Sequence, residues 1–286
     1  MKNIIYILFG LTVILTSCTP KPQPLTLDEA ETKLVISSQI IPNQIMVVTV
    51  SKSFGALSFN SDNGDTLTDE LINQLLVSNG IVTVSYQGIT DTLFAVPNTP
   101  GVYASLNTPQ FLNTQYTLNV HDPETGLSVN SSEFMLEQAQ IDSVSGLKGQ
   151  TAGVDYIDVN LKFPDLNGTN WYMANIYTTS DDTLTTSTDP FNNNSVPTQT
   201  VLFEQADFTN NYLDSTIRIF DWTQDTLFVS VSNISEGYYT YLRQRERGGN
   251  IFTSVVGEPI NYSTNINGGY GYFTTHYPNG RMLIIP

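Results

Sequence analysis

Cysteine and basic residues are both scarce in this sequence. Cys18 is the only cysteine among 286 residues, which excludes an intrachain disulfide and leaves the rest of the chain without a thiol for catalysis or metal binding. Lysine and arginine together number 11 against 27 acidic residues, for a formal net charge of −16. The few basic residues are scattered. The chain therefore lacks the basic face that nucleic acids or an anionic membrane surface would require.

Charge of either sign is also sparse, since only 13% of the residues are charged while 40% are hydrophobic. Threonine, serine and asparagine supply most of the remaining polarity. Exposed helices usually carry glutamate, lysine and arginine, so this composition favours β-sheet surfaces. The hydrophobic content is sufficient to fill real cores and argues against global disorder.

The N-terminus has the pattern of an export signal. Lys2 precedes an apolar stretch over residues 4–15, which is too short to span a bilayer comfortably. The stretch ends in Leu15-Thr16-Ser17-Cys18, which looks like a bacterial lipobox, in which the cysteine is acylated and becomes the mature N-terminus. An ordinary secretory signal with a chance cysteine is the alternative. The position of the lone cysteine favours lipidation of Cys18, with residues 1–17 as the signal peptide.

The residues after Cys18 predict a spacer. Three prolines fall within residues 19–24, which indicates a stiff, extended tether over 18–32. No acidic residue follows Cys18 directly, so the signal that retains some lipoproteins at the inner membrane is absent. We therefore expect a lipid-anchored protein of the outer membrane that is exposed on the cell surface.

The body from residue 33 onward reads as two series of short strands. Residues 81–86 and 156–163 alternate apolar and polar side chains, the period of a half-buried strand. We predict an all-β fold of two β-sandwich domains. The first, over 33–138, is immunoglobulin-like or transthyretin-like, and the second covers 139–286.

One segment of the second domain departs from the β pattern. Residues 235–247 predict a short helix, with Asn233 or Ser235 as its cap and Tyr238, Tyr241 and Leu242 on one face. Its last turn holds three of the chain's five arginines. There they suit the negative end of the helix dipole. Packing over an acidic sandwich explains this cluster more simply than a ligand site does.

Several features together resemble one family of lipoproteins. They are the lipobox, Lys33-Leu34-Val35-Ile36, Gly101-Val102-Tyr103, the helix Ser235-Glu236-Gly237-Tyr238-Tyr239-Thr240-Tyr241-Leu242, and Asn265-Ile266-Asn267-Gly268-Gly269-Tyr270-Gly271-Tyr272-Phe273. The chain resembles a domain-of-unknown-function lipoprotein family of Bacteroidota, whose members tend to be encoded beside TonB-dependent outer-membrane receptors. The resemblance implies an outer-membrane location and a transporter neighbourhood. It supplies no catalytic residues and no ligand.

Motifs for catalysis, cofactors and metals are not found in the sequence. His121 and His276 are the only histidines, and no nucleophile elbow accompanies either one. The acidic run Asp62-Asn63-Gly64-Asp65 fails the EF-hand spacing and reads as a solvated turn. We therefore predict no catalytic residue, no metal site, no cofactor, and no enzyme activity.

Aromatic side chains are the remaining functional hint. Tyr270, Tyr272 and Phe273 lie in a glycine-rich stretch, and we expect the glycines to leave these rings in a loop rather than in a packed strand. Such rings are common anchors of protein interfaces. The alternative is that they close the core of the second sandwich.

Six tripeptides resemble the O-glycosylation acceptor of the Bacteroidota envelope. In each one, aspartate is followed by serine or threonine and then by an aliphatic residue or threonine. Composition alone would give about one or two such tripeptides. The acceptor hydroxyls would be those of Thr66, Thr92, Ser143, Thr183, Ser215 and Thr226. The alternative is turn chemistry, in which the aspartate ends a turn and the next residues open a strand.

Taken together, these features predict an accessory or ligand-handling subunit of a TonB-dependent nutrient uptake system. Its expected partners are a TonB-dependent outer-membrane receptor, the membrane through the lipid anchor, and a glycan or peptide ligand, with no role for nucleic acid. Two alternatives stay open. One is a cell-surface glycan-active enzyme, which would need two carboxylates at a fixed separation. The other is a structural or assembly lipoprotein.

Overall fold

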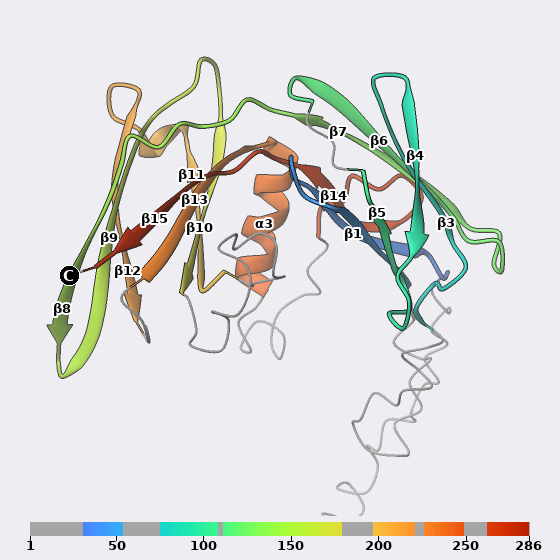
Figure 1. The fold of residues 1–286 in the computed structure, drawn as a ribbon, viewed down its shortest axis with the longest axis horizontal. Helices are drawn as coiled ribbons and strands as arrows, with labels where there is room; N and C mark the ends of the chain where they lie inside the picture. The colour runs from blue at the N-terminus through green and yellow to red at the C-terminus, as the bar shows by residue number, and fades with distance from the viewer. Residues whose placement is uncertain are drawn as a thin grey trace, which may run out of the picture.

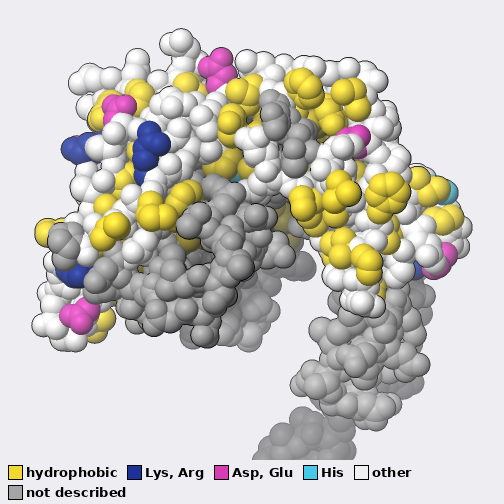
Figure 2. Space-filling view, in the orientation of Figure 1, with side chains coloured by type: hydrophobic (Ala, Val, Ile, Leu, Met, Phe, Trp, Pro, Cys, Tyr) yellow, Lys and Arg dark blue, Asp and Glu magenta, His cyan; other side chains and the backbone are white. Residues whose placement is uncertain are grey.

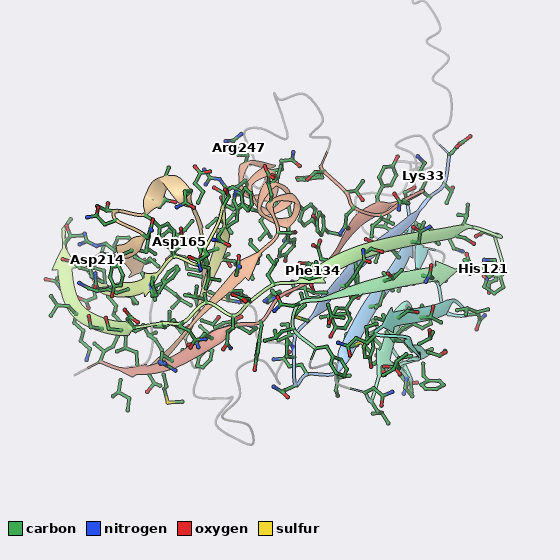
Figure 3. All side chains as sticks on the ribbon, turned by 90° about the horizontal axis from the view of Figure 1, so that it is seen from above. Lys33, His121, Phe134, Asp165, Asp214 and Arg247 are labelled. Atoms are coloured by element: carbon green, nitrogen blue, oxygen red, sulfur yellow. The ribbon has the colours of Figure 1, made fainter. Side chains whose placement is uncertain are left out.

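The computed structural model describes residues 31–53, 75–107, 111–178, 197–220, 226–248 and 262–285. Within these ranges the chain is built of strands with one α-helix, so the all-β prediction is confirmed. Two sandwiches lie side by side with the helix between them, and Figure 3 shows the same arrangement from above, with His121 and Asp214 at opposite ends (Figures 1 and 3).

An eight-stranded sheet folded around one core makes the first sandwich. Its spatial order is β14-β1-β2-β5-β4-β3-β6-β7. The strands are β1 (Leu34–Ile40), β2 (Met46–Lys52), β3 (Ile81–Tyr86), β4 (Ile89–Ala95), β5 (Val102–Ser105), β6 (Thr114–His121), β7 (Ser128–Met135) and β14 (Tyr270–Thr275).

Strict alternation explains why these segments form strands around a core. In β6, Tyr116, Leu118 and Val120 are buried while the residues between them face outward. The two edges of the sheet approach each other, since the N–H of Asn267, just before β14, donates to the carbonyl oxygen of Asn130 in β7 at 2.8 Å. The sheet therefore closes nearly completely around its core.

A second pair of sheets forms the other sandwich. A four-stranded sheet has the order β11-β10-β13-β15, and a three-stranded sheet has the order β12-β9-β8. The strands are β8 (Ser143–Thr151), β9 (Val154–Pro164), β10 (Trp171–Thr178), β11 (Gln199–Glu204), β12 (Tyr212–Phe220), β13 (Thr226–Ile234) and β15 (Asn279–Ile284), with a 3-10 turn, η4 (Gln205–Asp207), after β11.

The core of the second sandwich is rich in aromatic contacts. Phe163 packs edge-on against Tyr172 and Phe208, with ring centroids 5.1 and 5.5 Å apart. The hydroxyl of Tyr172 donates to Asp165 at 2.6 Å and so finds a partner at the rim of the core. Edge-to-face geometry of this kind adds to the stabilisation from burial alone.

The C-terminal part of the chain links the two sandwiches. Strand β14 pairs in parallel with β1, with Ile36 opposite Gly271. Three residues later the chain enters β15, which pairs with β13 of the other sandwich. A linear boundary near residue 138 thus describes the first of three crossings between the sandwiches but neither the return to β14 nor the passage from β14 to β15.

Helix α3 (Glu236–Gly248) follows β13 directly and fits the predicted helix at 235–247. The hydroxyl of Ser235 accepts the N–H of Tyr238 at 3.3 Å, so Ser235 rather than Asn233 caps the first turn. Arg245 and Arg247 lie in the last turn, as the dipole argument expects. The helix packs Tyr238 and Tyr239 against Met173 and Ile234 of the four-stranded sheet.

Candidate interaction surfaces

A chain of hydrogen bonds crosses the joint between the sandwiches. The side-chain amide of Gln39 in β1 donates to the hydroxyl of Tyr238 in α3 at 3.2 Å. The oxygen of the same amide lies 3.2 Å from Nε2 of His276, and Nδ1 of His276 lies 2.9 Å from the hydroxyl of Ser232 in β13. Because the amide oxygen can only accept, Nε2 carries the proton and Nδ1 accepts from Ser232.

His276 is held in the neutral form at this joint. Its side chain is buried, and burial lowers its pKa to about 4 because the charged imidazolium would lose its hydration. Both ring nitrogens have partners from different sandwiches. His276 thus has a structural role between the sandwiches, and its two partners lie far from it in the sequence.

A carboxylate supports the joint from the side of the first sandwich. Burial raises the pKa of Glu133, and this is opposed by hydrogen bonds from the Phe134 N–H, Ser235 and Asn265. Asn265 also exchanges two hydrogen bonds with the backbone of Phe273, at 2.6 and 3.0 Å. Glu133 therefore connects β7, the helix cap and the segment that leads into β14.

Tyrosine rings gather where α3 meets β14. The Tyr272 ring lies 5.3 Å from that of Tyr238 and 5.0 Å from that of Tyr241. Burial raises the pKa of Tyr272 to about 12. The Tyr272 hydroxyl lies so close to Gly237 that a Cβ at that position would be 2.4 Å away. Glycine at the start of α3 is what allows the helix to approach the joint.

The arginines of α3 line the exposed side of this tyrosine cluster. The guanidinium of Arg243 lies 5.9 Å from the Tyr239 ring, and that of Arg245 lies 5.8 Å from the Tyr241 ring. Arg243 also forms an ion pair with Glu246 at 3.4 Å. These contacts fit the packing interpretation of the arginine cluster better than a ligand site.

The prediction that the glycine-rich aromatic stretch forms an exposed loop is wrong. Tyr270, Tyr272 and Phe273 lie in strand β14, and Phe273 is fully buried in the core of the first sandwich, not the second. Tyr272 is buried at the joint, and only Tyr270 is substantially exposed, at 44%.

The physical reason for this error is the role of Gly271. A Cβ on Gly271 would lie 1.9 Å from the carbonyl oxygen of Ile36, and its φ is +93°. The glycine is thus needed for close pairing with β1 and does not loosen the backbone.

The predicted glycosylation residues lie on strands where the structure describes them. Thr92 and Ser143 are exposed, in β4 and at the start of β8, while Ser215 and Thr226 are half-buried in β12 and β13. Cys18, Thr66, Thr183 and the acidic run at 62–65 lie outside the described residues.

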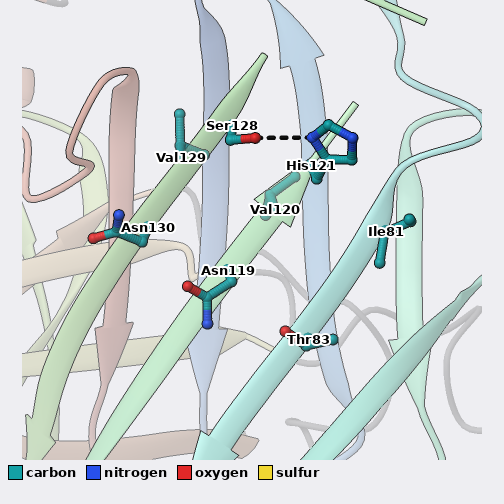
Figure 4. Close-up of a pocket in the computed structure, with 8 residues that line it drawn as sticks. All are labelled: Ile81, Thr83, Asn119, Val120, His121, Ser128, Val129 and Asn130. Atoms are coloured by element: carbon teal, nitrogen blue, oxygen red, sulfur yellow. Dashed lines mark hydrogen bonds between the residues drawn. The ribbon is translucent and has the colours of Figure 1, made fainter. Parts of the chain in front are cut away.

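A shallow groove lies on the outer face of the first sandwich, at the end where His121 sits (Figure 4). Nδ1 of His121 lies 2.8 Å from the Ser128 hydroxyl. The groove is lined by Ile81, Thr83, Asn119, Val120, His121, Ser128, Val129 and Asn130. Its side chains are neutral amides, hydroxyls and aliphatic groups around one imidazole, which suits contact with a neutral surface.

Hydrophobic side chains also gather on the surface next to this groove, over β4 and β5 (Figure 2). Phe94 is 70% exposed and Leu106 is 91% exposed. Sequence reasoning missed this surface. The signal was present: Leu93 and Phe94 are adjacent in one strand, so one of them must face outward.

The outer face of the three-stranded sheet has a different character. Arg218 donates two hydrogen bonds to Asp158, at 2.7 and 2.8 Å, and its guanidinium lies 3.7 Å from the Tyr156 ring. Lys162 forms an ion pair with Asp214 across the same face. The Arg218 guanidinium lowers the pKa of Asp158, and the hydrogen bond from Lys162 lowers that of Asp214.

Among the described side chains, no group of three or more histidines, aspartates or glutamates is placed to hold a metal ion. In the part of the chain that the structure covers, no helix combines the length and the hydropathy of a bilayer crossing.

Fold and surfaces together define a two-sandwich β protein with exposed apolar side chains gathered on its first sandwich. The family follows from a comparison with family models. Residues 21–277 match the model described as Domain of unknown function (DUF4249), and the chain belongs to this family. A comparison with curated proteins finds no match.

Proposed function

We propose that the protein is a lipid-anchored lipoprotein of the outer membrane, directed to the cell surface. There it acts as an accessory or ligand-handling subunit of a TonB-dependent nutrient uptake system. The observation that carries this proposal is the group of exposed apolar side chains gathered on the first sandwich of an acidic chain, with Leu106 and Phe94 the most exposed of that group. Exposed apolar groups gathered in one place are typical of surfaces that bind another molecule.

The tether and the hydrogen-bonded joint support the same proposal. A lipid on Cys18 and the proline-rich residues 18–32 would confine the body close to the membrane while leaving it free to dock sideways. The hydrogen bonds that run from Tyr238 through Gln39 to His276 couple the sandwiches across the joint. A partner that binds one sandwich would therefore also position the other.

Lipidation is tested by fractionation of cells that express Cys18→Ser. We expect this variant to leave the membrane fraction, because the signal would no longer supply an acylated residue. A variant that stays in the membrane at wild-type levels would show that the anchor is elsewhere. Pro22→Ala, which alters the tether but keeps the lipobox, is the matched control.

Partnership is tested by purification of the tagged protein from solubilised outer membranes. Co-purification of a β-barrel receptor supports the proposal. A free monomer that hydrolyses glycans would instead support the cell-surface enzyme, and a free monomer without activity would favour a structural or assembly role.

Glycosylation is a separate proposal for the same exported body. The exposed hydroxyl of Ser143, at the start of β8 on the second sandwich, is well placed among the described acceptors. We expect the intact mass of protein purified from its native host to exceed the sequence mass by hexose-sized increments, and Ser143→Ala to remove part of the excess. A native mass equal to that of the unmodified, processed chain would exclude the modification.

A further inference from the structure

The exposed apolar side chains of the first sandwich form a continuous row across its strands. Val47 in β2 pairs with Ala104 in β5, and Ala104 pairs with Phe94 in β4. Ile81 in β3 lies one register step beyond the Val82–Leu93 pair, which places it beside Phe94. Since side chains one row apart alternate between faces, these members of the row all point away from the core.

A second row extends the surface at the same end of the strands. Met46 pairs with Ser105, so Ile45 and Leu106 lie one step beyond that pair, on the outer side. We call the five exposed residues of the two rows, Ile45, Val47, Ile81, Phe94 and Leu106, the β4–β5 patch. Figure 2 shows hydrophobic side chains gathered over β4 and β5.

The patch is electrically neutral although the chain carries a net charge of −16. Its five members are aliphatic or aromatic, and the residues between them, Ala104 and Thr92, are uncharged. The carboxylate of Asp91, next to this row in β4, is buried and receives hydrogen bonds from Tyr86 and Asn107. A charged partner surface would therefore find no counter-charge at the patch.

The size of the patch and the charge of the chain decide between two occupants. The exposed area of five such side chains is on the order of several hundred Å², below the ~800 Å² per partner of a typical stable complex. A second copy would also bring a second chain with a net charge of −16 close to the first, and the two chains would repel each other. A partner held in the same membrane is different, because confinement raises the effective concentration and a smaller contact suffices.

We propose that the β4–β5 patch docks on a neutral, apolar surface of an integral outer-membrane protein. This proposal rests on the proposed function and adds to it the face of the molecule that makes the contact. Phe94 lies at the centre of the row and is the expected anchor, since a large exposed ring loses little conformational entropy on binding.

The test compares matched substitutions on the two sandwiches in the full, lipidated chain. Phe94→Asp and Leu106→Asp place a carboxylate in the patch, while Ile284→Asp places one at a position that is 72% exposed on the second sandwich. We expect each patch variant to reduce the β-barrel protein recovered from solubilised membranes at least about tenfold, because a carboxylate buried without a partner is costly. Recovery with Ile284→Asp should match the wild type.

A thermal melt on each purified variant separates an effect on docking from an effect on folding. Because all of the substituted side chains are exposed, we expect unchanged melting midpoints. If Phe94→Asp lowers the midpoint, Phe94→Ser provides the same comparison without a new charge. A photoreactive phenylalanine analogue at position 94 gives a second readout. A cross-link to the β-barrel protein that is recovered with the wild type supports the proposal.

Three outcomes overturn the assignment of the patch. They are full recovery of the barrel by both patch variants, a cross-link from position 94 to a second copy of the chain, and a cross-link to lipid alone. In each of these cases the proposed function stands if the wild type still recovers the barrel. If the wild type recovers no membrane protein, the proposed function itself fails and the patch proposal fails with it.

Discussion

Both sandwiches are built of strands in which buried and exposed residues alternate, but the side chains on their outer faces differ in charge. On the three-stranded sheet of the second sandwich, Arg218 and Lys162 are paired with Asp158 and Asp214 across neighbouring strands. On the first sandwich, the corresponding rows across β2, β5 and β4 are apolar and uncharged. Leu147 and Phe220 are also exposed on the charged face, but its ion pairs keep that face hydrated, whereas a neutral apolar face gains free energy when it is covered.

The sandwiches also differ in how they are completed. In the second, all strands except β15 come from one stretch of chain between Ser143 and Ile234. The first sandwich is completed only by β14, which follows its parallel partner β1 by more than 200 residues in the sequence. The first sandwich therefore depends on the fold of the rest of the chain, and this dependence can be tested by removing single side chains.

Truncation of Phe273 should have the largest effect. Phe273 lies in β14 but is fully buried in the core of the first sandwich. We expect Phe273→Ala to reduce the free energy of unfolding by about 3–5 kcal/mol, the usual cost of removing a buried aromatic ring. Urea denaturation followed by tyrosine fluorescence measures the loss. Phe94→Ala is the matched control and should change stability by less than about 0.5 kcal/mol; equal losses in the two variants would show that β14 does not complete the core.

The joint is tested by the neighbouring tyrosines. Tyr272 is buried against Tyr238 and Tyr241, so Tyr272→Ala should cost about 3 kcal/mol. Tyr270 is 44% exposed, and Tyr270→Ala should cost no more than about 0.5 kcal/mol. Separate thermal melts of the two single variants provide the comparison. A stable Tyr272→Ala protein would mean that the ring does not hold α3 to β14.

Local pattern was sufficient to predict much of the fold. Alternation in residues 81–86 and 156–163 is seen in β3 and β9, and the helix at 235–247 is confirmed as α3. These features depend on neighbours in sequence, either through the period of the side chains or through the Ser235 cap.

Pairings between distant segments could not be predicted in the same way. Nothing near Gly271 in the sequence shows that it lies against Ile36, so its glycine was interpreted as loop chemistry. The neutral state of His276 could not be predicted for the same reason, because its partners Gln39 and Ser232 come from two different strands. The row that contains Phe94 also depends on the register of four strands, which no single segment encodes.

The buried His276 predicts how stability at the joint depends on pH. Its pKa in the folded protein is about 4, below its ordinary value of 6.5, so between these values the unfolded chain binds the proton more readily. Stability should therefore fall as the pH is lowered from about 6.5 to about 4, by up to roughly 3 kcal/mol. Urea denaturation at a series of pH values measures this loss.

The loss should be smaller in His276→Gln, which cannot titrate at this position. His121→Gln leaves His276 in place and should keep the wild-type profile. Glu133 contributes with the opposite sign, because burial raises its pKa in the folded state and so favours folding at low pH. Adding Glu133→Gln to the wild type should therefore make the loss on acidification steeper. If His276→Gln follows the wild-type curve throughout, the joint histidine is not the group that titrates.

The ion pairs on the outer face of the second sandwich should have the smallest effect. The Arg218–Asp158 pair is well aligned but partly exposed, with 44% and 23% of the two side chains accessible to solvent. Water and salt screen such pairs, so we expect Arg218→Gln to lower the melting temperature by on the order of 2 °C or less. The difference from wild type should shrink further in 1 M salt.

The matched change on the first sandwich is Thr92→Gln, at an exposed position without an ion pair, where salt should make no difference. If Arg218→Gln instead destabilises the protein as strongly as Tyr272→Ala, the charged face contributes to folding and not only to hydration. The contrast between the faces of the two sandwiches would then have to be explained by stability rather than by contact with a partner.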